Sequence, residues 1–346
     1  MTVVHGGDVW RGHEPGAFLD FSANLNPEGP PRWVAKALAK GLANVGWYPD
    51  VHSEAALAGM SAFLGLPEEC LLLTAGGIEA AALAAALPPG DDLSLEDKSS
   101  QVCAGGHAVA QPTFQEYGRL CGGFRGVPRD DLAAYRPEPG ETLWLCNPNN
   151  PTGDALSRDD VLALLERVEA AKGRLVVDEA FIDYCPDHTV RDMVTRRPAL
   201  VVLGSLTKVL AIPGARLGYL AVHPDVVRRL KAKQLPWWLN CLADAVAAVL
   251  PGHEEDFKQI RALNARRRAA FAEALSTLGA KVHPSEANFL LCDFGRDMRP
   301  AIEELRRQRI LVRPCGMFPG LTHGHVRLCV RTKAENARLI EALGRL

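Results

Sequence analysis

The sequence predicts an α/β protein with a mostly parallel sheet, followed by a smaller α+β region. Short runs of consecutive apolar residues recur through the middle of the chain. Such runs are typical of strands that are buried on both faces of a parallel sheet. A helical pattern separates the first two runs, as expected for a βαβ unit. The runs are TLWLC (142–146), RLVVD (174–178), ALVVLG (199–204) and LGYLAV (217–222).

The chain length indicates more than one domain. A single core rarely grows beyond about 250–300 residues, and this chain has 346. The first 35 residues are rich in Gly and Pro and have few periodic apolar positions, so we expect them to form an arm. We expect a large domain over 36–235 and a small C-terminal domain over 236–346.

Charge and hydropathy exclude several classes of protein. The net charge is -2 with both signs interspersed, which gives no reason to expect a nucleic acid or an anionic membrane as partner. No apolar run reaches the ~18 residues of a membrane span. The first sixteen residues lack the apolar core of a signal peptide. We therefore expect a cytoplasmic protein.

The cysteines and histidines do not form a recognisable metal or disulfide pattern. There are nine cysteines and no C-x-x-C pair, so reduced thiols are the better interpretation. The HGH at 323–325 could hold a metal, but a solvated loop is the simpler explanation. We expect no metal.

Helix signals complete the pattern of elements. A helix is predicted over 157–173, with Ser157 as N-cap and Gly173 as C-cap. A long amphipathic helix is predicted over 254–278. It is followed by NFLLCDF (288–294), a helix at 300–308, RILVRP (309–314), HVRLCVRT (325–332) and a final helix. The polar segment 90–107 is predicted to be a surface loop, and no chemistry is assigned to it.

Lys208 allows two chemical interpretations. Ser205-Leu206-Thr207-Lys208 matches S-x-x-K, in which a serine attacks and a lysine assists it. That chemistry also needs S-D-N-like and K-T-G elements, and neither string is present. Alternatively, Lys208 forms a Schiff base with a carbonyl cofactor. A pyridoxal phosphate site would need an anion cradle, a carboxylate facing the pyridine nitrogen and an aromatic face over the ring.

Candidates for each of these partners are present. Gly76 and Gly77 stand between an apolar strand and an alanine-rich helix, where backbone N–H groups can bind an anion. Arg216 could add a charged fork. Taken alone, the glycines could serve only a tight turn, and the arginine could be a surface ion-pair partner.

A carboxylate and an amide are predicted at the carboxyl edge of the sheet, the usual ligand side. Asp178 ends the run RLVVD and could keep a ring nitrogen protonated; alternatively, it caps the following turn. CNPNNPTG (146–153) follows the preceding strand and could point an amide at a ligand. As turn chemistry alone it would be unremarkable.

The order of these motifs resembles the fold-type-I pyridoxal-phosphate enzymes, and more closely their histidinol-phosphate aminotransferase branch. It runs through G-G, PTFQEY (112–117), CNPNNPTG, VVDEAFIDY (176–184), SLTK and GARLGY (214–219). Within that branch, further segments are similar to the threonine-phosphate decarboxylases of cobalamin biosynthesis. These segments are HGGDVWR (5–11), LDFSANLNPEGPP (19–31), WYPD (47–50), KQLPWWLN (233–240) and RILVRPC (309–315).

The resemblance implies an activity and a cofactor. The activity is decarboxylation of L-threonine O-3-phosphate to (R)-1-amino-2-propanol O-2-phosphate, with pyridoxal 5'-phosphate as cofactor. The alternative is a histidinol-phosphate-type aminotransferase.

The resemblance also implies roles for individual residues. Lys208 would bind the cofactor covalently, Asp178 would pair with its pyridine nitrogen, and Phe114 would stack on the ring. Asn150 would meet the ring hydroxyl and contribute to substrate binding. The cofactor phosphate would be held by Gly76, Gly77, Ser205, Thr207 and Arg216. The substrate carboxylate would meet Arg327, and its phosphate would meet Arg313 and His5. Tyr48 would reach the neighbouring subunit's cofactor, which implies a homodimer with shared sites.

Two departures from the resemblance bear on the site. The relatives usually have G-N-G before the phosphate-binding helix, whereas this chain has Thr74-Ala75-Gly76. A side-chain amide is lost, so we expect the backbone alone to make that contact. Phe181 stands where the aminotransferases have tyrosine; the decarboxylases also tolerate Phe there.

Overall fold

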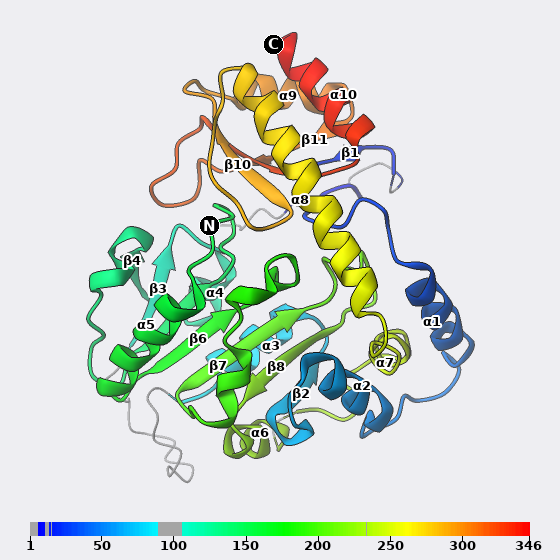
Figure 1. Cartoon of the computed structure of the whole chain (residues 1–346), viewed down its shortest axis with the longest axis vertical. Coiled ribbons are helices and arrows are strands. Elements are labelled where there is room, and N and C mark those ends of the chain that lie inside the picture. Colours follow the sequence, from blue (N-terminus) through cyan, green and yellow to red (C-terminus); the bar gives the residue numbers. More distant parts are fainter. Residues whose placement is uncertain (1–5, 11–13, 15, 89–105, 233) are drawn as a thin grey trace.

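A seven-stranded mixed sheet forms the centre of the larger part of the molecule (Figure 1). Its strand order is β2-β8-β7-β6-β5-β3-β4, and every neighbouring pair is parallel except those that involve β8. The strands are β2 (Leu71–Thr74), β3 (His107–Gln111), β4 (Arg125–Pro128), β5 (Thr142–Cys146), β6 (Arg174–Asp178), β7 (Leu200–Ser205) and β8 (Gly218–Val222).

The structure is a computed structural model that describes residues 6–10, 14, 16–88, 106–232 and 234–346. The predicted loop 90–107 lies outside the described residues except at its end, where His107 begins β3.

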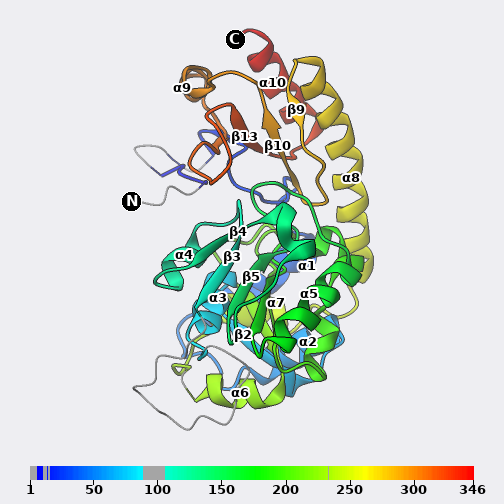
Figure 2. The same ribbon diagram turned by 90° about the vertical axis from the view of Figure 1, so that its left-hand side faces the viewer.

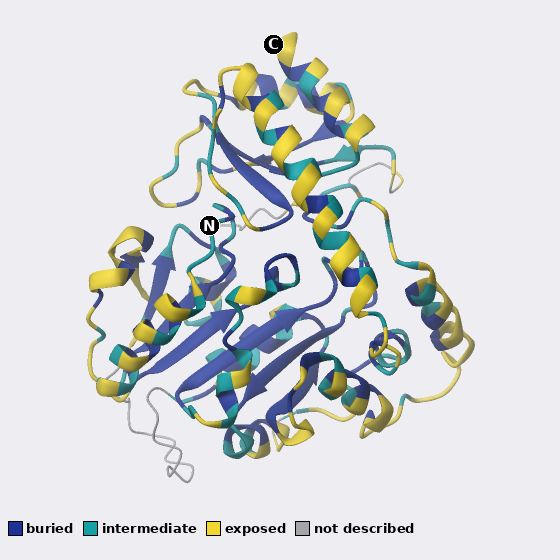
Figure 3. Cartoon of the chain, viewed as in Figure 1, coloured by how far each residue is buried: buried dark blue, intermediate teal, exposed yellow. Residues whose placement is uncertain are grey.

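The four predicted apolar runs are strands of this sheet. Every residue of β5, β6, β7 and β8 is buried, as Figure 3 shows in dark blue. The antiparallel direction of β8 follows from its connection to β7. A parallel neighbour needs a crossover, usually a helix, and 206–217 contains only turns. The predicted fold class is confirmed.

Helices cover both faces of the sheet and flank it (Figure 2). They are α1 (Arg32–Ala43), α2 (Glu54–Leu64), α3 (Gly77–Ala85), α4 (Glu116–Leu120), α5 (Arg158–Ala170), α6 (Pro224–Lys231) and α7 (Cys241–Ala247).

Helix α5 begins where the sequence predicts but ends differently. Ser157 is its N-cap, and Ser157 Oγ accepts from the Asp160 N–H at 3.1 Å. Gly173 is not the C-cap, because the left-handed turn is made by Lys172 with φ 52°. Gly173 serves a close approach instead: a Cβ there would lie 2.4 Å from the Glu141 carbonyl oxygen.

A second, smaller part contains an antiparallel sheet of order β12-β13-β10-β9 and a parallel pair of β1 with β11. The predicted 254–278 helix is α8 (Glu254–Thr277). The other elements are β1 (Leu19–Asp20), β9 (Lys281–Val282), β10 (Phe289–Asp293), α9 (Arg299–Arg307), β11 (Ile310–Leu311), β12 (Arg313–Pro314), β13 (His325–Cys329) and α10 (Lys333–Gly344).

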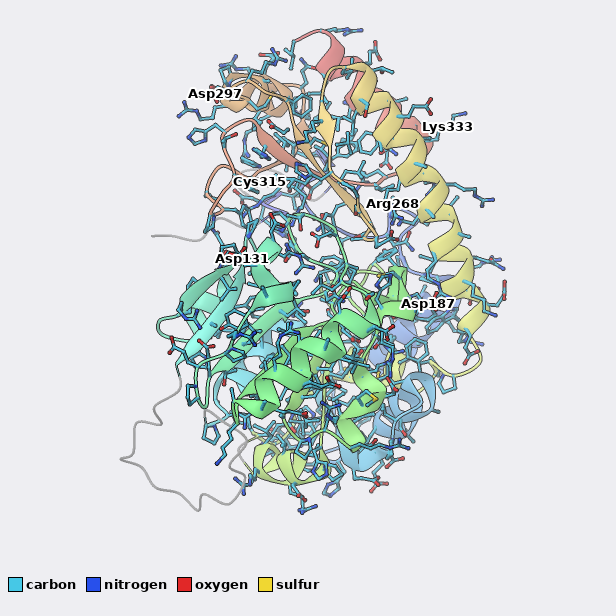
Figure 4. All side chains as sticks on the ribbon, turned by 60° about the vertical axis from the view of Figure 1, so that its left-hand side comes forward. Asp131, Asp187, Arg268, Asp297, Cys315 and Lys333 are labelled. Carbon is cyan, nitrogen blue, oxygen red and sulfur yellow. The ribbon has the colours of Figure 1, made fainter. Side chains whose placement is uncertain are left out.

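Helix α8 joins the two parts. Phe257 near its start belongs to the core around the large sheet, whereas Phe271 and Leu275 belong to the core of the small part. Arg268 projects from α8 toward the chain before β10 (Figure 4), where Arg268 Nη1 donates to the Ala287 carbonyl oxygen at 2.9 Å. The helix therefore spans both parts of the molecule.

The two cores divide the chain differently from the predicted domain boundaries. Helix α7, placed in the small domain by the sequence, packs against α1 and contributes to the large core. Phe21, placed in the arm, lies in the core of the small part. The Gly/Pro-rich composition of the first 35 residues concealed this, because two strand residues and one buried aromatic leave no periodic pattern.

Neither a metal-binding cluster nor a membrane-spanning helix is found among the described residues. These residues contain no group of three or more His, Cys, Asp and Glu side chains arranged to hold a metal ion. No described helix is both long and apolar enough to cross a bilayer.

Candidate functional site

Two cavities at the carboxyl edge of the large sheet gather most of the predicted site residues. Cavity A, of about 540 Å³, lies between the two parts of the molecule, and cavity B, of about 150 Å³, lies next to it. Phe114, Asn150, Phe181 and Lys208 line both. Cavity A is also lined by Arg313 and Arg327, and cavity B by Gly77, Asp178, Ser205 and Arg216.

Lys208 lies just beyond the end of β7, where the two cavities meet. Its Nζ donates to Thr207 Oγ1 at 3.1 Å. Burial lowers the pKa of Lys208 to about 8; Arg216 and Arg327 add to the decrease, and Asp178 opposes it. A neutral amine is a nucleophile, so this environment suits covalent chemistry at Nζ.

The serine-nucleophile interpretation lacks its central contact. Ser205 Oγ is hydrogen-bonded to Thr207 Oγ1 at 2.8 Å. Among the described residues, Ser205 has no hydrogen bond to Lys208, which an assisted serine would need. The hydroxyls of Ser205 and Thr207 instead form a short polar chain beside cavity B.

Asp178 is a buried carboxylate at the end of β6. Its Oδ1 accepts from the Ala180 N–H at 2.9 Å, and its Oδ2 accepts from the Tyr117 hydroxyl. Burial raises the pKa of Asp178; the hydrogen bonds from Tyr117 and Ala180 and the charge of Lys208 oppose the increase. The carboxylate therefore both caps the following turn and faces cavity B.

The glycine turn forms a close-packed cradle at the N-terminus of α3. Gly76 has φ 84°, and a Cβ there would lie 2.4 Å from Arg216 Nη2. The Ala75 N–H donates to the Glu79 carboxylate, and the Gly76 N–H donates to the Thr74 carbonyl oxygen at 2.7 Å. The backbone donors left for an anion at this end of the described helix are therefore those of Gly77 and Ile78.

Arg216 faces this cradle and is not an ion-pair partner. Its guanidinium donates to two carbonyl oxygens, of Ala75 at 3.2 Å and of Pro213 at 3.1 Å. No carboxylate of the described residues forms a salt bridge with it, so its charge has no counter-ion within the described part of the chain.

The asparagines of CNPNNPTG have separate tasks. Asn147 exchanges two hydrogen bonds with the backbone of Leu156, and Asn149 Nδ2 donates to the Pro112 carbonyl oxygen at 2.8 Å. These two side chains shape the turn. Asn150 lines both cavities, and its Oδ1 accepts from Arg327 Nη1.

Arg313 and Arg327 are buried arginines on neighbouring strands of the small part. Arg327 Nη2 donates to the Ser22 carbonyl oxygen at 2.6 Å, and Arg313 Nη2 lies 3.7 Å from Met317 Sδ. Neither forms a salt bridge with a described residue. Burial lowers the pKa of both, for Arg327 to about 10. Two buried, unneutralised guanidinium groups therefore face cavity A.

Four predicted site residues are not among those that line the cavities. Gly76 and Thr207 are chain neighbours of the cavity B residues Gly77 and Lys208. Tyr48 is 80% exposed and packs on Trp237 with ring centroids 4.6 Å apart. His5 lies outside the described residues. The neighbouring Gly6 and Gly7 do line cavity A, and the Gly7 N–H donates to Ser22 Oγ at 2.8 Å.

The sequence interpretation missed two residues of the site. Tyr117 contacts Asp178 and lines cavity B; it belongs to the quoted segment PTFQEY, but no pattern in that segment indicated the contact with Asp178. Asn24 lines cavity A, is 6% exposed, and its Oδ1 has no hydrogen-bond partner among the described residues. Its signal was a polar residue within the quoted segment LDFSANLNPEGPP.

Comparisons with known proteins identify relatives of this chain. The chain is 34% identical to threonine-phosphate decarboxylase of Salmonella typhimurium, over 99% of this chain and 96% of that protein. It is 35% identical to a histidinol-phosphate aminotransferase of Symbiobacterium thermophilum, over 94% and 89%. The crystal structure of L-threonine-O-3-phosphate decarboxylase from Porphyromonas gingivalis is 25% identical, with a TM-score of 0.79 over 93% of this chain and 100% of that one.

The family assignment covers nearly the whole chain. Residues 17–343 match the family described as Aminotransferase class I and II. Its members depend on pyridoxal phosphate, which confirms the predicted cofactor. The chain belongs to the aminotransferase class I and II family.

Proposed function

We propose that the chain is a pyridoxal-phosphate-dependent decarboxylase of L-threonine O-3-phosphate, which yields (R)-1-amino-2-propanol O-2-phosphate. The observation that carries the proposal is the pair of buried arginines, Arg313 and Arg327, facing the cavity that contains Lys208. Two buried positive charges without a counter-ion are energetically unfavourable. A substrate with both a carboxylate and a phosphate would neutralise them.

The residues of cavity B fit the cofactor. Asp178, a buried carboxylate, lines this cavity together with Lys208, Gly77, Ser205 and Arg216, and Arg216 lies against Gly76. The unneutralised charge of Arg216 and the free N–H groups at the start of α3 suit a phosphate. A side chain at Gly76 would collide with Arg216, so the cradle requires glycine.

Each residue then has a defined task. Lys208 would hold the cofactor through Nζ, Phe114 would cover the ring, and Asn150 would bind the ring hydroxyl. Asp178 would hold a proton at the pyridine nitrogen. The bound cofactor supplies an electron sink for the bond of the substrate Cα that stands perpendicular to its ring.

In this proposal, the two arginines orient the substrate and so determine which bond of its Cα is broken. Arg327 would bind the substrate carboxylate and Arg313 its phosphate, so the substrate is fixed at both ends. Decarboxylation breaks the bond between Cα and the carboxylate carbon, carbon dioxide leaves without the bonding electrons, and a proton replaces it at Cα. Lys208 Nζ, with a pKa of about 8, carries a proton at neutral pH and lies in the same cavity.

The second candidate is a histidinol-phosphate-type aminotransferase, which would use the same electron sink. The long match to the Salmonella decarboxylase, 99% of this chain against 94% for the Symbiobacterium aminotransferase, supports decarboxylation. So do Gly6 and Gly7 of the HGG segment, which line cavity A. Phe181 lines both cavities and lacks the hydroxyl that a tyrosine would add there.

Product analysis tests the proposal. Purified protein with pyridoxal phosphate should release one carbon dioxide for each L-threonine O-3-phosphate consumed, without a keto-acid acceptor. Carbon dioxide would be measured by a coupled assay and the amine by mass spectrometry. Amino transfer between glutamate and imidazole-acetol phosphate, with no carbon dioxide from threonine phosphate, would establish the alternative. L-Serine O-3-phosphate is the matched comparison, because it differs by one methyl group, which is worth ~1–3 kcal/mol of discrimination.

An exposed apolar surface supports a homodimer. Tyr48 contacts Trp237 in a tilted ring pair, and several residues close to them in the sequence are apolar and exposed: Leu42 61%, Val45 67%, Trp47 73% and Leu235 78%. Exposed apolar side chains that gather in one patch mark interaction sites. We expect sedimentation to give twice the 37.4 kDa of the chain. A monomer at micromolar concentration would contradict the shared-site arrangement.

A further inference from the structure

Tyr117 is a buried tyrosine whose hydroxyl is directed at the cofactor cavity. Its side chain is 0% exposed, and its hydroxyl donates to Asp178 Oδ2. Tyr117 also lines cavity B together with Asp178 and Lys208. None of the roles assigned so far uses this hydroxyl.

Packing fixes the Tyr117 ring on two sides. The ring stacks on Trp144 with centroids 5.3 Å apart, and meets Phe114 edge to face at 5.5 Å. Trp144 is itself held by its Nε1 donating to His107 Nδ1 at 3.3 Å. Because the aromatic neighbours hold the ring, its hydroxyl has little freedom to leave the carboxylate.

The hydrogen bond bears on the charge of Asp178. Full burial disfavours an ionised carboxylate, and Asp178 has no salt-bridge partner among the described residues. Its two oxygens receive one hydrogen bond each, from the Tyr117 hydroxyl and the Ala180 N–H. Hydrogen bonds to a charged acceptor favour the charged form. Removing the tyrosine donor therefore raises the pKa of Asp178 further.

We propose that Tyr117 is the positioning residue of Asp178: it keeps the carboxylate ionised and aimed at the pyridine nitrogen of the cofactor. The inference rests on the cofactor role of Asp178 in the proposed function, but not on which substrate bond is broken. It predicts that Tyr117 affects cofactor affinity and the chemical step, and not the binding of the substrate carboxylate or phosphate.

The test is a double-mutant cycle on cofactor affinity. Apoenzyme is titrated with pyridoxal phosphate, and the Kd is followed by quenching of tryptophan fluorescence. Tyr117→Phe should raise this Kd about 10-fold, as expected for a lost hydrogen bond to a charged group. In an Asp178→Asn background the same substitution should change the Kd less than about 2-fold, because the charged acceptor is gone. With substrate, kcat should fall while KM stays within about 2-fold.

Tyr184→Phe is the matched control. Tyr184 is also buried, its hydroxyl forms no hydrogen bond with Asp178, and it lines neither cavity. Its substitution should leave the Kd unchanged. Should Tyr117→Phe fail to fold, Trp144→Phe removes the stack and leaves the hydroxyl and Asp178 in place. That variant should give a smaller increase in Kd that also disappears with Asp178→Asn.

Two results would overturn the proposal. One is a Kd and kcat for Tyr117→Phe equal to those of the unmodified protein. The other is the same fold-change with and without the Asp178 carboxylate, which would mean that Tyr117 only supports packing. If the unmodified protein binds no pyridoxal phosphate, the cofactor assignment itself is contradicted. That outcome is distinguishable from a failure of the Tyr117 proposal, because it is seen before any substitution.

Discussion

Lys208→Ala is expected to lower turnover of L-threonine O-3-phosphate at least about 10⁴-fold, the scale at which loss of a covalent group acts. The visible absorption of lysine-bound pyridoxal phosphate should disappear with it. The physical reason is that Lys208 is the amine at which the two cavities meet. Absorption spectroscopy and a carbon dioxide assay on the same samples measure both effects.

Lys231→Ala provides the control, because Lys231 is exposed at the end of α6 and lies outside both cavities. It should match the unmodified protein in colour and rate.

The Lys208 amine should also give a characteristic pH dependence. Since the pKa of Lys208 is about 8, the rate at which apoenzyme recovers its colour should rise through pH 8 and level off above it. A rate that keeps rising beyond the ordinary lysine pKa of ~10.4, or a coloured Lys208→Ala protein, would contradict the assignment.

Arg327→Leu is expected to lower kcat/KM for threonine phosphate by at least about 30-fold, because losing one partner of a buried charge pair costs about 2–5 kcal/mol. The free protein should not be destabilised correspondingly. Arg327 has no salt-bridge partner among the described residues, and a buried charge without a counter-ion is itself unfavourable. Steady-state kinetics and thermal unfolding of the apoenzyme separate the two effects.

Comparison with Arg313→Leu makes the test specific. The reaction product keeps the phosphate and lacks the carboxylate. If Arg327 binds the carboxylate, its loss should weaken substrate binding and leave product inhibition nearly unchanged. Loss of Arg313 should weaken both. Arg307→Leu, at an exposed arginine paired with Glu303 and Glu304, should change neither. Equal effects of the two buried substitutions on substrate and product would refute the division of roles.

The sequence was most informative where one residue type suits one environment. Runs of buried apolar residues located β5 to β8. The carboxylate at the end of RLVVD identified Asp178, and the SLTK motif identified Lys208. Because strand ends meet at one sheet edge, those positions could be placed together before any coordinates. The family resemblance added Arg313 and Arg327 to the predicted site, and both line cavity A in the structure.

Other features depend on contacts between distant residues. Tyr117 and Asp178 are 61 positions apart, and no local sequence pattern in either segment predicts their hydrogen bond. The pairing of β1 with β11 and the placement of α7 against α1 were missed for the same reason. Local patterns report how a segment buries its own side chains, but not which partner buries them. Gly173 is another example. Glycine is required there because the carbonyl oxygen of the distant Glu141 leaves no room for a Cβ atom.

Helix α8 has a consequence for how the molecule comes apart. Its Phe257 is packed in one core and its Phe271 and Leu275 in the other, and Phe21 ties the N-terminal segment to the second core. Unfolding of either core would therefore remove the packing contacts at one end of α8 and expose its apolar side chains there to water. A chain of 346 residues with two hydrophobic cores would often unfold in separate steps. Here the shared helix couples the two, so heat should disrupt both cores in one cooperative transition.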